Sequence, residues 1–291
     1  MAGECDVSVV IPARNAAGLL PVQLAALAAQ RFDGGFEVII VNNGSQDSTG
    51  CVGTAWSQSF RRIVTIHADE QVGIAYARNE GARVAQGRLL LFCDADDMVE
   101  VGWVDAMVSA LSRHDVVGGR LELAVLNDKV SRGWRTDPTL SDLPVALRFL
   151  PYAVGANMGF RREVYAALGG CDESYVGGHE EVELCWRAQL RGYQIAYASE
   201  AIVHYRLRDT IAALARQRFG SGRTYAQLHA AYADRIGSNV RLSSEAVRCG
   251  RLLLRSPQLL RRRTAGRWIF EAAWHAGRIH GSIKVGLLSP E

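Results

Sequence analysis

No apolar stretch in this sequence is long enough to cross a membrane. The longest apolar runs lie at residues 7–11 and 89–93. They have the length of a strand, whereas a transmembrane helix needs about 20 residues. The first residues, Met1 to Asp6, carry neither the basic nor the apolar region of a secretory signal. We therefore expect the protein to lie in the cytoplasm.

Cysteine and proline are also scarce. The 6 cysteines are scattered without a Cys-x-x-Cys pair, so neither a zinc cluster nor a disulfide framework is indicated. The 7 prolines are dispersed, and the sequence has no low-complexity tract and no repeat of solenoid or propeller period. With 48% hydrophobic and 22% charged residues in a chain of 291, the composition is that of an ordinary globular protein.

The charge is divided unevenly along the chain. Residues 1–205 carry 17 Lys and Arg against 25 Asp and Glu, a net charge of −8, whereas residues 206–291 carry 16 against 5, a net charge of +11. A basic region of this kind favours an anionic contact, either nucleic acid or a lipid headgroup layer. No nucleic-acid recognition motif accompanies the charge, so nucleic acid is not an expected partner. We place a domain boundary near residue 206.

The apolar pattern of the first part alternates between strands and helices. The expected strands are residues 7–11, 36–41, 63–66, 88–93, 116–125 and 194–204, and the expected helices are 19–30, 48–60, 72–86, 103–111 and 180–191. This alternation predicts an α/β fold with a mainly parallel sheet. Ligands of such sheets bind at the carboxyl ends of the strands. Residues 126–150 are expected to be irregular, and the chain from Asp209 onward is expected to be helical.

Three carboxylates follow the buried strand that ends at Cys93. Asp94, Asp96 and Asp97 lie within four residues and repel one another unless a cation is bound. Hard oxygen ligands suit Mg²⁺ or Mn²⁺, which commonly also hold phosphate groups. The alternative is an acidic loop that is simply solvated, or a helix start stabilised by the helix dipole.

Three further polar groups have both a functional and a structural interpretation. Asn42 and Asn43 either bind a nucleoside or form a tight turn before a helix. Glu180 and Glu181 follow a Gly-Gly pair and either supply a general base or complement a helix dipole. His204 is structural or a ligand, and Arg206 and Arg208 can pair with phosphate.

The order and spacing of these clusters resemble those of the family 2 glycosyltransferases, which have the nucleotide-sugar-binding GT-A fold. Four stretches within residues 7–205 carry the resemblance. They are residues 9–15 (VVIPARN), residues 37–47 (EVIIVNNGSQD), residues 77–82 (ARNEGA) leading into 91–97 (LFCDADD), and residues 169–174 (GGCDES) leading into 180–187 (EEVELCWR).

The resemblance implies a role for each matching residue. The implied metal ligands for Mg²⁺ or Mn²⁺ are Asp94, Asp96 and His204, with Asp97 assisting. Glu181 matches the catalytic base, which is usually Asp in the family, and Glu180 is the alternative. The implied nucleotide-sugar-binding residues are Pro12, Ala13, Arg14, Asn15, Asn42, Asn43, Arg78, Asp94, Ala95 and Asp96.

The implied reaction is an inverting, metal-dependent transfer of a sugar from a nucleoside-diphosphate donor to an acceptor hydroxyl. The acceptor would be a glycan, a lipid-linked molecule or a small molecule, with residues 156–174 forming its wall and Trp134, Trp186 and Tyr175 either stacking on sugar or packing in the core. A nucleotidyltransferase and an inactive sugar- or nucleotide-binding protein are the alternatives.

The basic helical region, residues 206–291, matches no motif. It either packs on the catalytic domain or on another subunit, giving a homo-oligomer, or lies peripherally on the inner face of an anionic cell membrane.

Overall fold

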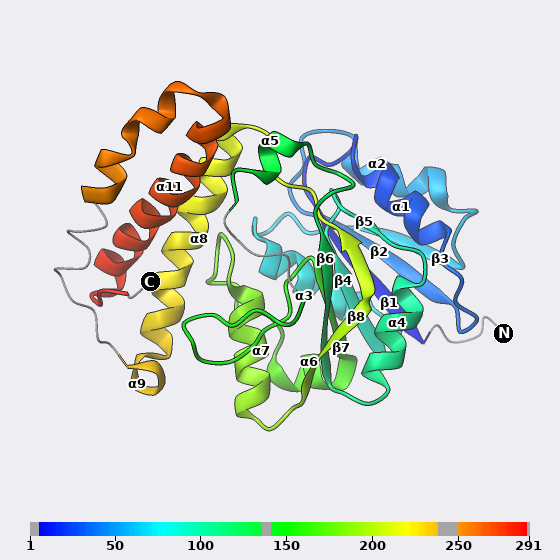
Figure 1. The fold of residues 1–291 in the computed structure, drawn as a ribbon. Coiled ribbons are helices and arrows are strands. Elements are labelled where there is room, and N and C mark those ends of the chain that lie inside the picture. Colours follow the sequence, from blue (N-terminus) through cyan, green and yellow to red (C-terminus); the bar gives the residue numbers. More distant parts are fainter. Residues whose placement is uncertain (1–5, 136–140, 238–249, 290–291) are drawn as a thin grey trace.

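The computed structural model describes residues 6–135, 141–237 and 250–289 (Figure 1). Its centre is an eight-stranded sheet with the strand order β3-β2-β1-β4-β7-β6-β8-β5. The strands are β1 (Val7–Ala13), β2 (Phe36–Asn42), β3 (Arg62–His67), β4 (Leu89–Cys93), β5 (Met98–Val99), β6 (Val116–Glu122), β7 (Asn157–Arg161) and β8 (Ile195–His204).

The sheet is mixed and mainly parallel, as the sequence predicts. Strands β3, β2, β1 and β4 run parallel to one another, and β6 and β8 share their direction. Only β7 and the two-residue β5 are antiparallel to their neighbours. The predicted α/β fold class is therefore confirmed, and the carboxyl ends of β1, β2 and β4 meet at one edge.

Helices cover both faces of the sheet. In β1, Val7, Val9 and Ile11 belong to the core on one face, whereas Val10 belongs to the core on the other. This burial on both faces explains why the central strands are continuous apolar runs. Helices α1 (Leu20–Ala28) and α4 (Trp103–Leu111) cover the first face, and α3 (Ile74–Val84), α6 (Arg162–Leu168) and α7 (Glu180–Leu190) cover the second.

Three segments differ from the prediction. Strand β7 and helix α6 were not predicted, because residues 157–161 (NMGFR) have no β-branched residue and only tertiary pairing with β4 and β6 makes them a strand. The helix expected at 48–60 is shorter, with α2 (Thr49–Val52) followed by the 3₁₀ helix η1 (Gly53–Trp56). A short helix, α5 (Lys129–Arg132), interrupts the segment expected to be irregular, of which residues 136–140 lie outside the described part.

Beyond β8, two long helices pack against each other. They are α8 (Ile211–Ala231) and α11 (Arg262–Val285), which lie side by side (Figure 1). The short helix α9 (Ala233–Ile236) and the 3₁₀ helix η2 (Ser256–Leu260) lie between them in the sequence. A Cβ at Gly277 would collide with the backbone of Phe219, and one at Gly222 with the backbone of Trp274. Glycine at these points lets the two helix backbones approach closely.

No helix in the described ranges combines the length and apolarity needed to span a bilayer. The described cysteines, Cys51, Cys93, Cys171 and Cys185, are free thiols, and Cys5 and Cys249 lie outside the described residues.

Candidate functional site

The loops that follow β1 and β2 are tied together at the edge of the sheet. Pro12 and Ala13 end β1, and Ala13 pairs with Asn42 at the end of β2. Asn15 has a positive φ of 50°. Its backbone N–H donates to Ser45 Oγ (3.0 Å), and its Oδ1 accepts from the Gln46 N–H (2.8 Å). Asn15 therefore shapes this loop, while Arg14 beside it is exposed.

The two asparagines of the second loop differ in what they leave available. The Asn43 amide donates to the backbone oxygens of Ala68 and Gln71, the latter at 2.7 Å, and its Oδ1 accepts from the Gly73 N–H at 2.8 Å. Asn43 thus holds the turn before α3. Asn42 Nδ2 lies 3.2 Å from His67 Nδ1, while its buried Oδ1 has no hydrogen-bond partner within the described chain.

The acidic cluster lies directly after β4. Asp94, Asp96 and Asp97 can each offer one oxygen so that all three lie within 4.8 Å of one another, while Ala95 between them packs in the core. Burial raises the pKa of Asp94 to about 6. Burial, together with the neighbouring aspartates, raises the pKa of Asp97 well above its usual range. The cluster thus has a poorly compensated negative charge.

Only part of this charge is neutralised by the chain itself. Arg208 Nη1 lies 2.7 Å from Asp96 Oδ2, and the Arg206 N–H donates to Asp97 Oδ1 at 2.7 Å. The second oxygen of Asp97 is buried without a hydrogen-bond partner among the described residues. A set of hard carboxylate oxygens with one orphaned buried oxygen fits Mg²⁺ or Mn²⁺.

Arg78 connects the acidic cluster to the start of α7. Its guanidinium is buried, with Nη1 2.5 Å from Glu180 Oε1 and Nη2 3.4 Å from Asp94 Oδ1. Burial opposes the charged form, yet the two carboxylates hold the pKa of Arg78 above its ordinary value. Arg78 therefore remains a cation and brings together two residues 86 positions apart in the sequence.

Glu181 is half-buried, and its carboxylate accepts a hydrogen bond from its own backbone N–H. No hydrogen bond or ion pair joins that carboxylate to any other described residue, whereas Glu180 is locked to Arg78. Burial, and then the charge of Glu180, raises the pKa of Glu181 to about 8. A carboxylate that binds a proton readily near neutral pH is suited to general-base work.

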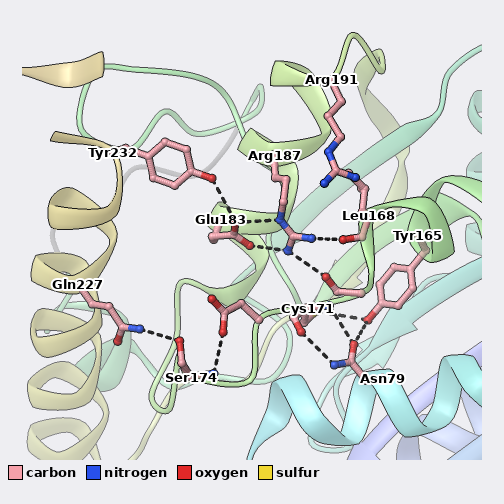
Figure 2. Close-up of polar contacts among 12 residues, drawn as sticks. Asn79, Tyr165, Leu168, Cys171, Ser174, Glu183, Arg187, Arg191, Gln227 and Tyr232 are labelled. Carbon is pink, nitrogen blue, oxygen red and sulfur yellow. Dashed lines mark hydrogen bonds and ion pairs between the residues drawn. The ribbon is translucent and has the colours of Figure 1, made fainter. Parts of the chain in front are cut away.

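Helix α8 supports the loop that precedes these glutamates. His179, the N-cap of α7, has a φ of 72° and its Nδ1 lies 2.9 Å from Thr224 Oγ1. The Gln227 amide donates to Ser174 Oγ at 2.8 Å (Figure 2), and Arg223 donates to the backbone oxygen of Val176. The basic helical region therefore contacts the candidate site directly.

A second network holds residues 168–174 on the other side of this loop (Figure 2). Arg187 pairs with Glu183 (2.6 Å) and donates to the backbone oxygen of Gly170 (2.9 Å). Asn79 donates to the backbone oxygen of Cys171 at 2.9 Å and to the Glu173 carboxylate at 2.8 Å. Asn79 and Arg187 were not among the expected site residues, although both lie within the stretches that carry the family resemblance.

His204 lies outside the acidic cluster. Its Nδ1 is 2.8 Å from Glu122 Oε2 and its Nε2 is 2.9 Å from Glu100 Oε2. Both ring nitrogens are therefore engaged by carboxylates, and this arrangement does not offer His204 as the metal ligand expected from the resemblance. The aromatic residues considered for sugar stacking, Trp134, Trp186 and Tyr175, are all buried in apolar clusters, which is the packing interpretation.

Comparisons with solved structures identify the fold. The mannosyltransferase PcManGT from Pyrobaculum calidifontis, in complex with GDP-Man and Mn²⁺, superposes with a TM-score of 0.63 at 17% identity and covers 95% of this chain and 86% of its own. TarS from S. aureus, in complex with UDP-GlcNAc, gives a TM-score of 0.58 at 15% identity, covering 97% and 92%. At these identities the likeness concerns the fold alone, the GT-A fold of glycosyltransferases.

Comparisons of sequence identify the family. Glycosyltransferase AglE from Haloferax volcanii is 29% identical over 199 residues, which cover 67% of this chain and 65% of AglE. The O-antigen biosynthesis protein RfbC from Myxococcus xanthus is 28% identical over 228 residues, covering 70% of this chain and 17% of RfbC. The chain thus spans less than two thirds of the length of these relatives. The family model described as glycosyl transferase family 2 matches residues 8–169, more than half of the chain, and the chain therefore belongs to the family 2 glycosyltransferases.

Proposed function

We propose that the protein is an inverting glycosyltransferase in which Glu181 is the catalytic base. The observation that carries the proposal is the contrast between two adjacent glutamates. Glu180 is bound to Arg78 at 2.5 Å, whereas the Glu181 carboxylate pairs with no other described residue, accepts a hydrogen bond only from its own backbone N–H, and has a pKa raised to about 8. The family resemblance points to the same position, and residues 1–205 would form the catalytic domain.

The donor is proposed to be a nucleoside-diphosphate sugar. The structures of PcManGT and TarS, which bind GDP-Man and UDP-GlcNAc, support this class. Asn42, whose buried Oδ1 has no hydrogen-bond partner among the described residues, and the loop of residues 12–15 would accommodate the nucleoside. Asp94, Asp96 and Asp97 would hold Mg²⁺ or Mn²⁺, which when bound supplies positive charge to the diphosphate.

The reaction follows from the roles of the chain's own residues. Glu181 accepts the proton of an acceptor hydroxyl while that oxygen forms a bond to the anomeric carbon. The bond between this carbon and the diphosphate oxygen breaks, and the electron pair leaves with the nucleoside diphosphate. A single displacement of this kind inverts the anomeric configuration. Arg78 holds the Glu180 carboxylate in a buried ion pair, so Glu181 is the carboxylate left to take the proton.

The acceptor is proposed to be a hydroxyl of a glycan, a lipid-linked molecule or a small molecule, approached past residues 156–174. The net charge of +11 over residues 206–291 supports peripheral contact with the inner face of an anionic membrane, with transfer on the cytoplasmic side.

The first experiment is a thermal-shift panel of nucleoside diphosphates and nucleotide sugars with and without Mn²⁺. A bound donor stabilises the folded protein by mass action, and we expect the largest shift with Mn²⁺ present. Asp96→Asn should remove the dependence on Mn²⁺. If no nucleotide shifts the midpoint in either condition, the proposed donor class is wrong.

The second experiment measures transfer itself. Glu181→Gln removes the base and should lower kcat by about 10²- to 10⁴-fold while leaving donor binding intact. Glu200→Gln, which replaces an exposed glutamate in β8, is the matched control and should keep full activity. NMR of the product gives its anomeric configuration, and retention of the donor configuration would contradict the single displacement.

A further inference from the structure

The segment of the sequence that connects α8 to α11 carries an exposed surface that is both apolar and cationic. Leu253, Leu254 and Leu260 are 71%, 83% and 87% exposed, among the most exposed large hydrophobic side chains of the described chain. Arg251, Arg255 and Arg261 are exposed within the same stretch. We refer to these six residues as the Leu–Arg surface.

The segment that carries this surface is fixed onto α11. The indole N–H of Trp268 donates to the Leu252 backbone oxygen at 2.8 Å, and the hydroxyl of Thr264 donates to the Gln258 backbone oxygen at 2.6 Å. Arg255 pairs with Glu271 at 3.2 Å, and the segment runs beside α11 (Figure 1). The leucines are therefore held outward by packed backbone, while the neighbouring Leu252 is half-buried.

The side chains of the Leu–Arg surface indicate what kind of partner would bind there. Three largely exposed leucines favour burial in an apolar phase, and the arginines beside them favour negative charge. A symmetric contact with a second copy would set this surface against itself and bring arginines toward arginines. The interface of an anionic bilayer accepts both kinds of side chain, with leucines among the acyl chains and arginines at the headgroups.

We propose that the Leu–Arg surface docks the protein on membranes that contain anionic lipid. The three leucines enter the interfacial layer, and Arg251 and Arg261 contact the phosphate-bearing headgroups, while Arg255 stays paired with Glu271. This inference deepens the peripheral membrane contact proposed above and does not depend on the assignment of Glu181. The surface lies in residues 251–261, away from the loops that would bind the donor.

Vesicle co-sedimentation of the full chain tests the proposal. We expect binding to vesicles of phosphatidylcholine with phosphatidylglycerol, and little binding to phosphatidylcholine alone. Leu254→Glu/Leu260→Glu should weaken binding by at least about tenfold, because insertion of two leucines is lost. Arg251→Gln and Arg261→Gln should each weaken it by about fivefold and reduce its sensitivity to salt.

Matched controls lie elsewhere on the surface. Leu190→Glu replaces a leucine that is 39% exposed at the end of α7, and Arg113→Gln replaces an exposed arginine after α4. Both should bind anionic vesicles as the wild type does. Every variant should keep its unfolding midpoint, since the replaced side chains are exposed.

Three outcomes would overturn the proposal. The first is that the wild type does not bind anionic vesicles, and the second is that Leu254→Glu/Leu260→Glu binds them as well as the wild type does. In the third, size-exclusion chromatography shows a wild-type dimer that the leucine variant abolishes, which would assign the surface to a second copy. Transfer to a soluble acceptor without vesicles reports on the proposed reaction separately, so the two proposals fail independently.

Discussion

Replacement of Arg78 tests how the candidate site is held together. Helix α3 carries two arginines that each pair with a glutamate, in opposite environments. Arg78 and Glu180 have side chains that are 1% and 3% exposed, whereas Arg83 and Glu80 are 68% and 24% exposed. Methionine at either position keeps most of the aliphatic stem and removes the charge. Comparing Arg78→Met with Arg83→Met therefore measures how much the burial of the ion pair changes the effect of losing its cation.

The expected effects differ strongly. Arg78→Met leaves Glu180 in a buried site without its cation, and removing one partner of a buried ion pair costs about 3–5 kcal/mol of unfolding free energy. For a protein of this size, Tm should fall by about 6–20 °C, at roughly 2–4 °C per kcal/mol. Arg83→Met should leave Tm unchanged within error, because exposed ion pairs contribute little.

A double variant separates the buried charge from lost packing. Arg78→Met/Glu180→Gln no longer leaves the Glu180 charge uncompensated, so its midpoint should recover part of the loss. Differential scanning calorimetry at pH 7 without metal measures all four proteins. Equal midpoints for Arg78→Met and Arg83→Met, or a double variant less stable than Arg78→Met, would refute the view that this ion pair organises the site.

Three further predictions follow from the contacts of the site and the helices. Burial, and then the charge of Glu180, raises the pKa of Glu181 to about 8, so activity should rise with pH through about 8 as Glu181 loses its proton. Glu180→Gln removes that charge, so the rise in activity should begin at a lower pH. An unmoved pH profile would exclude Glu181 as the titrating base. Thr224→Val removes the hydroxyl that lies 2.9 Å from His179, the N-cap residue of α7, and should lower kcat on the order of 10-fold with the donor KM unchanged. Thr224→Ser keeps the hydroxyl and should retain activity. Equal kinetics for the two variants would contradict the view that Thr224 positions the start of α7. Gly277→Ala places a Cβ against the backbone of α8 and should lower the free energy of unfolding, measured by chemical denaturation, by about 1–3 kcal/mol. Gly250→Ala, whose Cβ would have no heavy atom within 4 Å, should be neutral or stabilising. A larger loss of stability for Gly250→Ala than for Gly277→Ala would be inconsistent with the close contact of the two helices.

The elements predicted correctly are those with a strong local pattern. The central strands are continuous apolar runs, and the helix expected at 103–111 has those bounds in α4. Strand β7 was missed because its sequence carries no β-branched residue and its identity depends on hydrogen bonds to β4 and β6. The shortened helix after Ser48 has the same cause, since local propensity alone does not decide where packing ends a helix.

In the candidate site too, the features predicted correctly depend on residues close together in the sequence, and those missed depend on tertiary contacts. The acidic cluster after β4 was predicted from three carboxylates behind a buried strand, and the structure brings their oxygens within 4.8 Å. The engagement of both His204 nitrogens was not predictable, because Glu100 and Glu122 are 104 and 82 residues distant in the chain. The contact of α8 with the loop before Glu180 was missed for the same reason, since nothing in residues 206–237 resembles a motif.

The amino-acid sequence by itself determined the alternating strands and helices, the family, and which polar clusters stand at the sheet edge, because these depend on hydrophobic periodicity and on residues close together in the chain. Only the tertiary structure decided which carboxylate is engaged and which is open. That choice rests on Arg78 reaching Glu180 from 102 positions away, and burial strengthens this ion pair in a way that no local pattern encodes.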